Sequence, residues 1–227
     1  MYKQLATAAL FAAGVKAHGH LQSPEPRPLG AAMEAACGQQ VYDMMESDEN
    51  GNIQTMAQTG ASQSDYDATA CHLWQCRGYQ FADANSSTIH SYSAGQVIPV
   101  EVVIAAPHTG TANVSIINLA ENEVVGDLLA YWSVYASVST GVAANDTSFS
   151  ITMPDTLPDA CATQGGCAIQ WWWNAASIDQ TYMSCVDFVW DGTTAAGSSS
   201  SSAAASSAVA ASSTVAAASS ASSSSAA

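Results

Sequence analysis

Cationic side chains are scarce in this sequence. Only 4 of its 227 residues are Lys or Arg, whereas 19 are Asp or Glu, which gives a formal net charge of −15 at pH 7. A surface this acidic repels nucleic-acid phosphates and anionic lipid headgroups. We therefore expect neither nucleic acid nor an anionic membrane as a partner, whereas an uncharged polymer is compatible with the charge.

Long apolar runs and two hydrolase signatures are also missing. The apolar run at residues 5–15 is too short for a transmembrane helix, which needs about 20 residues, so we expect no transmembrane segment. No Gly-x-Ser-x-Gly elbow occurs, which disfavours an α/β-hydrolase. No carboxylate pair stands at a recognisable hydrolase spacing, so ordinary glycoside hydrolysis is disfavoured as well.

Residues 1–17 are typical of a signal peptide. A lysine precedes the apolar run at 5–15, and Ala17 stands where a signal peptidase cuts. The competing interpretation is a short buried helix behind an uncut initiator methionine. Cleavage after Ala17 would give a secreted, extracellular chain that begins at His18 and keeps only two arginines as strong cations.

The six cysteines are an even set, and together with a signal peptide this favours disulfides over zinc. The most economical pairing joins near neighbours and leaves one long-range pair: Cys71–Cys76, Cys161–Cys167 and Cys37–Cys185. Fifteen pairings are formally open. Zinc is disfavoured because no second ligand pair at zinc-finger spacing accompanies the first of these pairs.

Three asparagines lie in Asn-x-Ser/Thr sequons, which accept N-linked glycans in a eukaryotic secretory route. They are Asn85, Asn113 and Asn145. We expect a glycoprotein, with the occupancy of each sequon left open.

Composition separates a folded part from a tail. Residues 192–227 are rich in Ser and Ala, and from residue 198 onward only Ser, Ala, Val and Thr occur. Such a segment buries too little apolar area to offset its ordering entropy, so we expect a disordered stalk. Residues 18–191 have the size of one domain. The tail suits a cell-wall-associated protein, and whether an anchor or a binding module follows is left open.

Short β-branched or alternating segments predict an all-β domain. Six of them are separated by turn signals: 97–105, 112–119, 127–138, 148–153, 168–173 and 184–190. No helix-length repeat lies between them, so we expect an immunoglobulin- or fibronectin III-like antiparallel β-sandwich with long loops. Strand alternation would place Trp172 on the opposite face from Trp171 and Trp173.

The N-terminal half shows little periodicity. Ala31–Cys37 could form one or two helical turns. Asp48–Asn52 faintly resembles a calcium loop but lacks the acid spacing and the final Glu, so we expect a surface turn there. His72 and His90 carry no partner signal and are interpreted as structural or exposed.

A metal site is suggested by His18-Gly19-His20. If His18 becomes the first residue, its α-amine and its ring Nδ1 can close a chelate on one metal ion. His108, at the end of a predicted strand, offers a second imidazole. Two imidazoles and a primary amine suit copper best among the available divalent ions. A rival copper site would use the amine, two backbone amides and the His20 ring, without His108.

At this point the chain resembles the lytic polysaccharide monooxygenases, with the type-4 chitin-binding domain group of secreted fungal style as the nearest match. The motifs that carry the resemblance span the folded part in the family's order: His18-Gly19-His20, Ser23-Pro24, Pro26-Arg27, Ala106-Pro107-His108-Thr109, Ile169-Gln170-Trp171-Trp172-Trp173 and Tyr182-Met183-Ser184-Cys185-Val186-Asp187.

The resemblance implies copper-dependent oxidative cleavage of an insoluble polysaccharide, with chitin and cellulose as first candidates. It implies one copper ion held by His18 and His108, with Tyr182 at the axial side of the metal. Gln170 would be the hydrogen-bonding group that orients the activated oxygen species. An external electron donor and O2 or H2O2 would be needed, and we expect a monomer.

Two other functions stay open. One is a non-catalytic copper-binding protein of the cell surface with the same fold, and the other is a carbohydrate-binding module. In the enzyme, exposed aromatic residues around the copper would dock on the polysaccharide, and Tyr42, Trp74 and Tyr79 are the candidates.

Overall fold

The structure, a computed structural model of the chain, describes residues 18–194. The expected signal peptide and the tail from residue 195 lie outside the described residues. The described part belongs to one compact unit and contains a three-stranded and a five-stranded sheet. In spatial order the first sheet holds β1 (His18–Ser23), β3 (Val97–Ala106) and β6 (Ser148–Thr152), and the second holds β2 (Ile89–Ala94), β8 (Gln180–Thr194), β7 (Cys167–Ala175), β4 (Gly110–Asn118) and β5 (Glu123–Tyr135).

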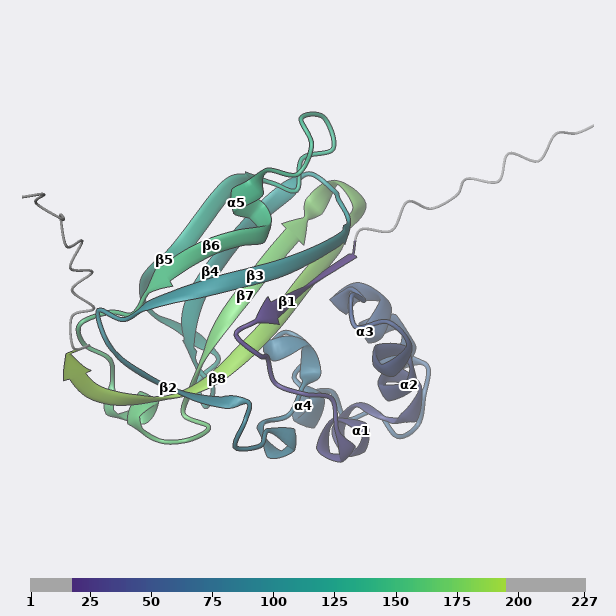
Figure 1. The fold of residues 1–227 in the computed structure, drawn as a ribbon. Coiled ribbons are helices and arrows are strands. Elements are labelled where there is room, and N and C mark those ends of the chain that lie inside the picture. The colour runs from purple at the N-terminus through teal and green to yellow at the C-terminus, as the bar shows by residue number, and fades with distance from the viewer. Residues whose placement is uncertain (1–17, 195–227) are drawn as a thin grey trace, which may run out of the picture. The chain divides into compact units, whose positions relative to one another are not determined.

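The two sheets form the expected all-β sandwich (Figure 1). Each of the six segments predicted as strands overlaps one of the strands β3 to β8, and the segment predicted at 127–138 runs three residues past the end of β5. One pairing differs from the antiparallel expectation, because β2 runs parallel to β8. Parallel neighbours need a long connection, and here residues 95–179, which include β3 to β7, lie between these two strands. The last strand also continues to Thr194, beyond the domain end expected at residue 191.

The core lies between the sheets and follows from strand alternation. Trp171 and Trp173 on β7 are fully buried there, whereas Trp172 faces the other side of the five-stranded sheet. The predicted alternation of the three tryptophans is therefore confirmed. On β6, Ile151 is buried between exposed neighbours, as its alternating sequence requires.

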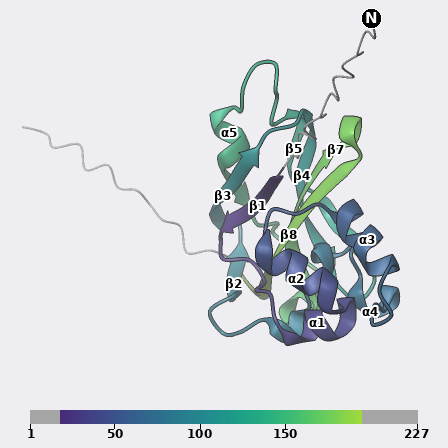
Figure 2. The same cartoon turned by 90° about the vertical axis from the view of Figure 1, so that its right-hand side faces the viewer.

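Four helices build a third layer on the outer face of the five-stranded sheet. They are α1 (Ala31–Cys37), α2 (Gln39–Ser47), α3 (Ile53–Ala61) and α4 (Ala68–Cys71). Their buried residues pack on Met183 and Trp172 of that sheet. The two views show them gathered beside β8, with β5 on the far side (Figure 1, Figure 2).

The helix at Ala31–Cys37 is confirmed, whereas the irregular structure expected after it is wrong for α2 and α3. Each of these helices is only nine residues long, and its buried residues, although at helical spacing, form too short a pattern to stand out in the sequence. The Asn52 side chain caps α3 by accepting a hydrogen bond from the Thr55 amide, which is a start signal visible in the sequence.

The remaining elements are short. They are α5 (Ala144–Thr147), η1 (Cys76–Gly78), η2 (Phe81–Asp83), η3 (Asp159–Ala162) and η4 (Ala176–Ile178). Within residues 18–194, no helix is long and apolar enough to cross a membrane.

All six cysteines form disulfides, but two of the three expected pairings are wrong. The Cys161–Cys167 bond is confirmed. The other two bonds are Cys37–Cys71 and Cys76–Cys185. Cys71 ends α4, which packs against α1 and its Cys37, while Cys76 lies in η1 over β8. Although only four residues stand between them, Cys71 therefore lies in the helical layer and Cys76 lies against the five-stranded sheet.

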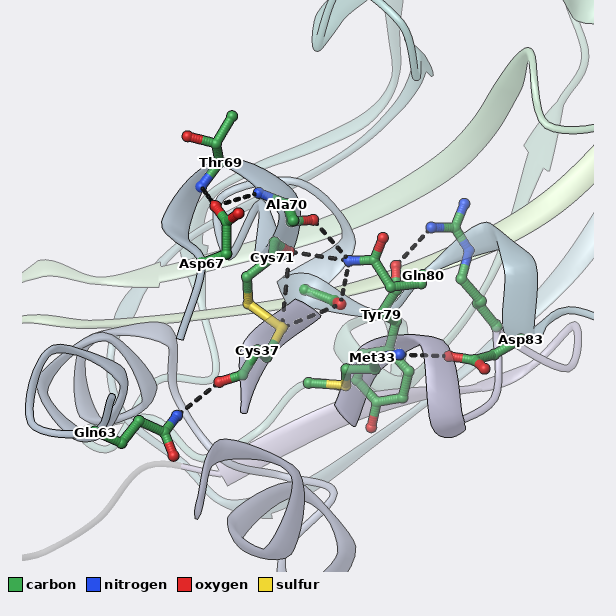
Figure 3. The surroundings of a disulfide bond; sticks show 12 residues. Met33, Cys37, Gln63, Asp67, Thr69, Ala70, Cys71, Tyr79, Gln80 and Asp83 are labelled. Carbon is green, nitrogen blue, oxygen red and sulfur yellow. Dashed lines mark hydrogen bonds between the residues drawn. A yellow bond between two sulfur atoms is a disulfide. The ribbon is translucent and has the colours of Figure 1, made fainter. Parts of the chain in front are cut away.

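The disulfide between α1 and α4 is surrounded by hydrogen bonds that fix the helical layer (Figure 3). The Gln63 side chain donates to the Cys37 carbonyl at 2.6 Å. The Gln80 side chain donates to the carbonyls of Ala70, Cys71 and Gly78. These contacts add to the small apolar core that the helices form with Met183 of β8.

Candidate metal centre

The sheet register brings His18 and His108 to the same end of the sandwich. Strands β1 and β3 are antiparallel neighbours, and His18 is the register partner of Ala106. His108 follows only two residues later, in the short turn that leads into β4. The Thr109 hydroxyl fixes this turn by accepting a hydrogen bond from the Val138 amide at 3.0 Å.

The buried indole of Trp173 lies beneath both histidine segments. A side chain added at Gly19 would place its Cβ 3.1 Å from the Trp173 ring, and one at Gly110 would place it 3.0 Å from Trp173 Nε1. The nearest obstacles are backbone oxygens: the Val103 carbonyl lies 2.9 Å from a Cβ built at Gly19, and the Asn174 carbonyl lies still closer to one built at Gly110. Glycine is therefore needed at both positions for this close packing. Tyr182 packs on the other part of the same ring, with 4.7 Å between the ring centroids.

Tyr182 is a neutral phenol in this environment. Burial raises its pKa, the negative charge of Asp48 adds to the rise, and Arg77 partly opposes it. Its hydroxyl donates a hydrogen bond to the Gln180 side chain. The sequence reasoning missed Gln180, although residues two apart on a strand share a face and Gln180 stands two residues before Tyr182.

Asp48 contacts one ring nitrogen of His18. His18 Nε2 lies 3.1 Å from Asp48 Oδ2. A carboxylate accepts hydrogen bonds, so a neutral His18 ring that donates to Asp48 would carry its proton on Nε2 and its lone pair on Nδ1. Nδ1 is the ring nitrogen that can form a chelate with the α-amine of the same residue. The contact therefore favours the tautomer that the predicted metal site requires.

The turn that contains Asp48 also contacts His20. Its Nδ1 lies 2.8 Å from Asn50 Oδ1, and its Nε2 lies 3.5 Å from Glu49 Oε1. The sequence prediction of a turn at Asp48–Asn52 is confirmed. Its side chains contact the two N-terminal histidines, which the sequence reasoning did not foresee.

His108 presents a buried nitrogen that lacks a protein partner. Its Nδ1 is buried and makes no hydrogen bond within the described part of the chain. Buried polar atoms normally have partners, so an orphan ring nitrogen beside a second imidazole fits a ligand-binding role. Between residues 18 and 194 no three His, Cys, Asp or Glu side chains gather as a metal site. Two imidazoles together with an α-amine at His18 would form a nitrogen donor set that fits copper.

Gln170 is not brought to the histidines. It lies on β7, where three residues of strand put about 10 Å between it and Trp173, and its side chain faces the outer side of the sheet. Its amide oxygen accepts a hydrogen bond from the Cys76 amide at 3.4 Å. This placement links Gln170 to η1, and its expected role beside activated oxygen lacks structural support.

The other sequence candidates are dispersed. His72 ends α4 in a left-handed conformation, and His90 contacts the Glu25 carbonyl and stacks on Tyr92. Trp74 is exposed, whereas Tyr42 and Tyr79 are half-buried. The sequence interpretation of His72 and His90 as structural or exposed agrees with these positions.

The described residues form a β-sandwich with a histidine at the start of its first strand and a second one in the loop after the neighbouring strand. The profile described as "lytic polysaccharide mono-oxygenase, cellulose-degrading" matches residues 18–188. The chain belongs to this family. The match begins at His18, the residue expected to open the mature chain.

Solved structures of related proteins are distant. A chitin-binding domain from Burkholderia pseudomallei is 12% identical, covers 77% of this chain and 100% of its own, and has a TM-score of 0.42. An AA10 lytic polysaccharide monooxygenase from Streptomyces lividans is 14% identical, with 57% and 71% covered and a TM-score of 0.34. An AA15 enzyme from Thermobia domestica in the Cu(I) state is 15% identical, with 76% and 98% covered and a TM-score of 0.37. No curated protein matches the chain.

Proposed function

We propose that the mature chain, cut after Ala17 and secreted, cleaves an insoluble polysaccharide oxidatively with one copper ion. The ion would be held by the α-amine and Nδ1 of His18 and by the His108 ring. The observation that carries the proposal is the register of β1 on β3, which places both histidines at one end of the sandwich. When bound, copper supplies the activation of O2 or H2O2 with electrons from an external donor.

The chain's own residues prepare this site. Asp48 holds the His18 ring by its Nε2 and leaves Nδ1 directed to the ligand. Trp173 and Tyr182 form a buried aromatic floor that excludes water from below. Gln180 holds the Tyr182 hydroxyl in place. Tyr182 contributes here as a neutral, packed phenol, since its raised pKa keeps the proton on it.

The rival copper geometry through His20 is disfavoured by the fold. Both ring nitrogens of His20 face polar partners in the turn, Asn50 and Glu49. The backbone of Gly19 and His20 lies in β1, paired with Ile104 and Val103 of β3. Use of these amides as copper ligands would require breaking the strand pairing, so the pair His18 and His108 is favoured.

The substrate class follows from charge and family. The chain has a strong net negative charge, which suits a neutral polymer such as chitin or cellulose and disfavours an anionic one. The family profile is described as cellulose-degrading, and one structural neighbour is a chitin-binding domain. We therefore keep both polymers as candidate substrates.

The proposal is tested with the copper-loaded mature protein on chitin and on cellulose, with a reductant and H2O2. We expect oxidised oligosaccharides by mass spectrometry from one of the two polymers. His108→Ala, and a chain that retains Ala17 before His18, should both release none. Tight copper binding without product on either polymer would instead support a non-catalytic copper protein. Undiminished product from either control chain would contradict the assigned ligands.

A further inference from the structure

A partly open groove lies on the outer face of the five-stranded sheet. The helices cover this face beside β8, but not toward β4 and β5 (Figure 1, Figure 2). The groove, which we call the outer groove, has a lining without ionisable side chains: Trp74, Asn113, Ser115, Ile117, Asn122, Val124, Leu128, Gln170 and Trp172. Its walls thus combine aromatic and aliphatic groups with neutral amides and a hydroxyl.

The apolar walls of the outer groove are unusually exposed. Trp74 is 49% exposed, Val124 53% and Leu128 46%. The Trp74 and Trp172 rings lie near each other, with centroids 6.2 Å apart. Contiguous exposed apolar side chains of this kind normally have an occupant. Aromatic rings beside neutral hydrogen-bonding groups suit a sugar, whose ring offers C–H groups on its faces and hydroxyls at its rim.

Asn113 lies within this surface. On one side it is in register with Tyr131 of β5, which is 60% exposed, and on the other with Trp172 of β7. Its half-buried side-chain amide makes no hydrogen bond within the described residues. Ser115, two residues on, faces the same groove. Asn113-Val114-Ser115 is therefore a sequon in which both defining side chains line the outer groove.

We propose that Asn113 carries an N-linked glycan whose first sugars fill the outer groove against Trp74 and Trp172. In the attachment step, a C–O bond between the first sugar and a lipid-linked diphosphate breaks. A C–N bond to Asn113 Nδ2 forms, and one amide proton leaves with the diphosphate. The proposal rests on the proposed secretion of the chain and is independent of copper.

The order of synthesis makes this attachment feasible. In the folded protein, strand β4 lies inside the five-stranded sheet, between β5 and β7. Both neighbours follow it in the sequence, so the sequon emerges before its strand partners exist. Glycan transfer can therefore precede folding, and the later closure of the sheet places the first sugars beside the aromatic residues.

The other two sequons provide controls. Asn145 is exposed in α5 and lines no wall of the outer groove. The Asn85 side chain accepts hydrogen bonds from the amide and hydroxyl of Ser87. Asn145 is the better matched control, since changing it disturbs no contact of this kind.

The first experiment expresses the full chain in a eukaryotic secretory host and maps glycosylation by mass spectrometry. We expect an occupied Asn113. Ser115→Ala, which keeps the asparagine and removes only the sequon, should remove one glycan and lower the Tm by about 2–4 °C. Asn145→Gln should leave the Tm unchanged. An unmodified Asn113 overturns the proposal, and so does a Ser115→Ala variant that loses the glycan with no change in Tm.

A second experiment separates a docked glycan from one that merely projects into solvent. In the native protein, an endoglycosidase should release the Asn113 glycan at least about tenfold more slowly than after denaturation, and Trp74→Ala should remove this protection. Equal release rates from native and denatured protein would contradict the docking. If Asn113 is unmodified and Trp74→Ala weakens binding to chitin or cellulose, the groove is a substrate surface and the proposal is wrong.

Discussion

At the scale of single residues, the turn at 48–50 is the feature that makes the N-terminal histidines unequal. Asp48 holds His18 by the nitrogen that a chelate does not need, while Asn50 and Glu49 hold His20 by both ring nitrogens. Under the proposed function, His18 is thereby oriented toward the metal ion, whereas the turn holds His20 in place. This distinction was not visible in the sequence, where His20 competes with His108 on equal terms.

We predict that Asp48→Asn weakens copper binding by the mature protein. Loss of a carboxylate that orients a ligating histidine typically reduces metal affinity by about 10–100-fold. The measurement is Cu(II) affinity by calorimetry, with the electron paramagnetic resonance spectrum as a second readout. Asp127→Asn, an exposed carboxylate on β5, serves as the charge-matched control. Equal affinities for the two variants would show that Asp48 does not position His18.

We also predict that His20→Ala preserves the Cu(II) spectrum, while His108→Ala changes it. The reason is that the amides of β1 are paired with β3, so the fold disfavours a chelate through His20. The measurement is the nitrogen hyperfine pattern of the copper-loaded proteins. The reverse result, in which His20→Ala abolishes the signal and His108→Ala leaves it intact, would sink the assignment.

At the scale of elements, the sequence predicted what alternation and β-branching determine. The strands β3 to β8 and the opposite facing of Trp172 follow from a two-residue period. The short helices α2 and α3 were missed because few apolar positions mark them, and β1 because its first residues are His and Gly. The parallel pairing of β2 with β8 and the true partners of Cys37 and Cys76 depend on contacts between distant layers, which local sequence does not encode.

The candidate site was predictable to a similar extent. His18 was suspected from the expected cut after Ala17, and His108 from its place at the end of a predicted strand and from the family resemblance. The strand register that brings them to one end of the sandwich is visible only in the structure. Gln170 was chosen for its place in a motif, yet its position on β7 directs it to the other face of the sheet. The Gln180 contact with Tyr182 lies within β8 and had a local signal, the two-residue spacing. The Asp48 contact with His18 forms only when the turn before α3 meets β1, so it had none.

The three disulfides should differ in their contribution to stability by the length of chain that they close. The sequence separations are 109 for Cys76–Cys185, 34 for Cys37–Cys71 and 6 for Cys161–Cys167. In the chain-entropy model, these loops correspond to about 5, 4 and 2 kcal/mol respectively. Replacing each pair by alanines should lower the free energy of unfolding in this order, as measured with guanidinium chloride. Removal of Cys161–Cys167 as the most damaging change would contradict the ranking.

At the scale of the whole molecule, the layers assign different tasks to different faces. The sandwich end carries the histidines, and the helical layer supplies the turn that contacts them. The outer face of the five-stranded sheet, where the helices leave it uncovered, carries the sequon at Asn113. The chain has few cationic side chains, and one of them, Arg27, is buried in an ion pair with Asp187. A neutral polymer is therefore the partner that this surface tolerates best.

Stability should fall in alkaline solution because tyrosines are buried. Burial raises the pKa of Tyr92 to about 12, from 10.0 for an exposed phenol. The folded state then keeps a proton that the unfolded state loses, so this stabilisation is complete below pH 10 and is lost as the pH rises toward 12. Because the phenol is only partly shielded from solvent, screening limits the loss from this residue to about 1–2 kcal/mol.

The measurement is the free energy of unfolding between pH 9 and pH 11. Tyr92→Phe should flatten the decline, whereas Tyr131→Phe, at an exposed tyrosine, should not. Disulfide exchange is limited in this test, since residues 18–194 contain no free cysteine. An identical decline for both variants would exclude Tyr92 as a source.

The position of His18 at the start of an edge strand has a consequence for the timing of reactivity. The nitrogen that joins Ala17 to His18 is an amide and becomes a basic amine only when that bond is cut. Under the proposed function, the precursor is a zymogen in which hydrolysis of one peptide bond creates a metal ligand. The cell that makes the protein is thereby spared its oxidative chemistry, because the same cut that completes export also switches on the copper site.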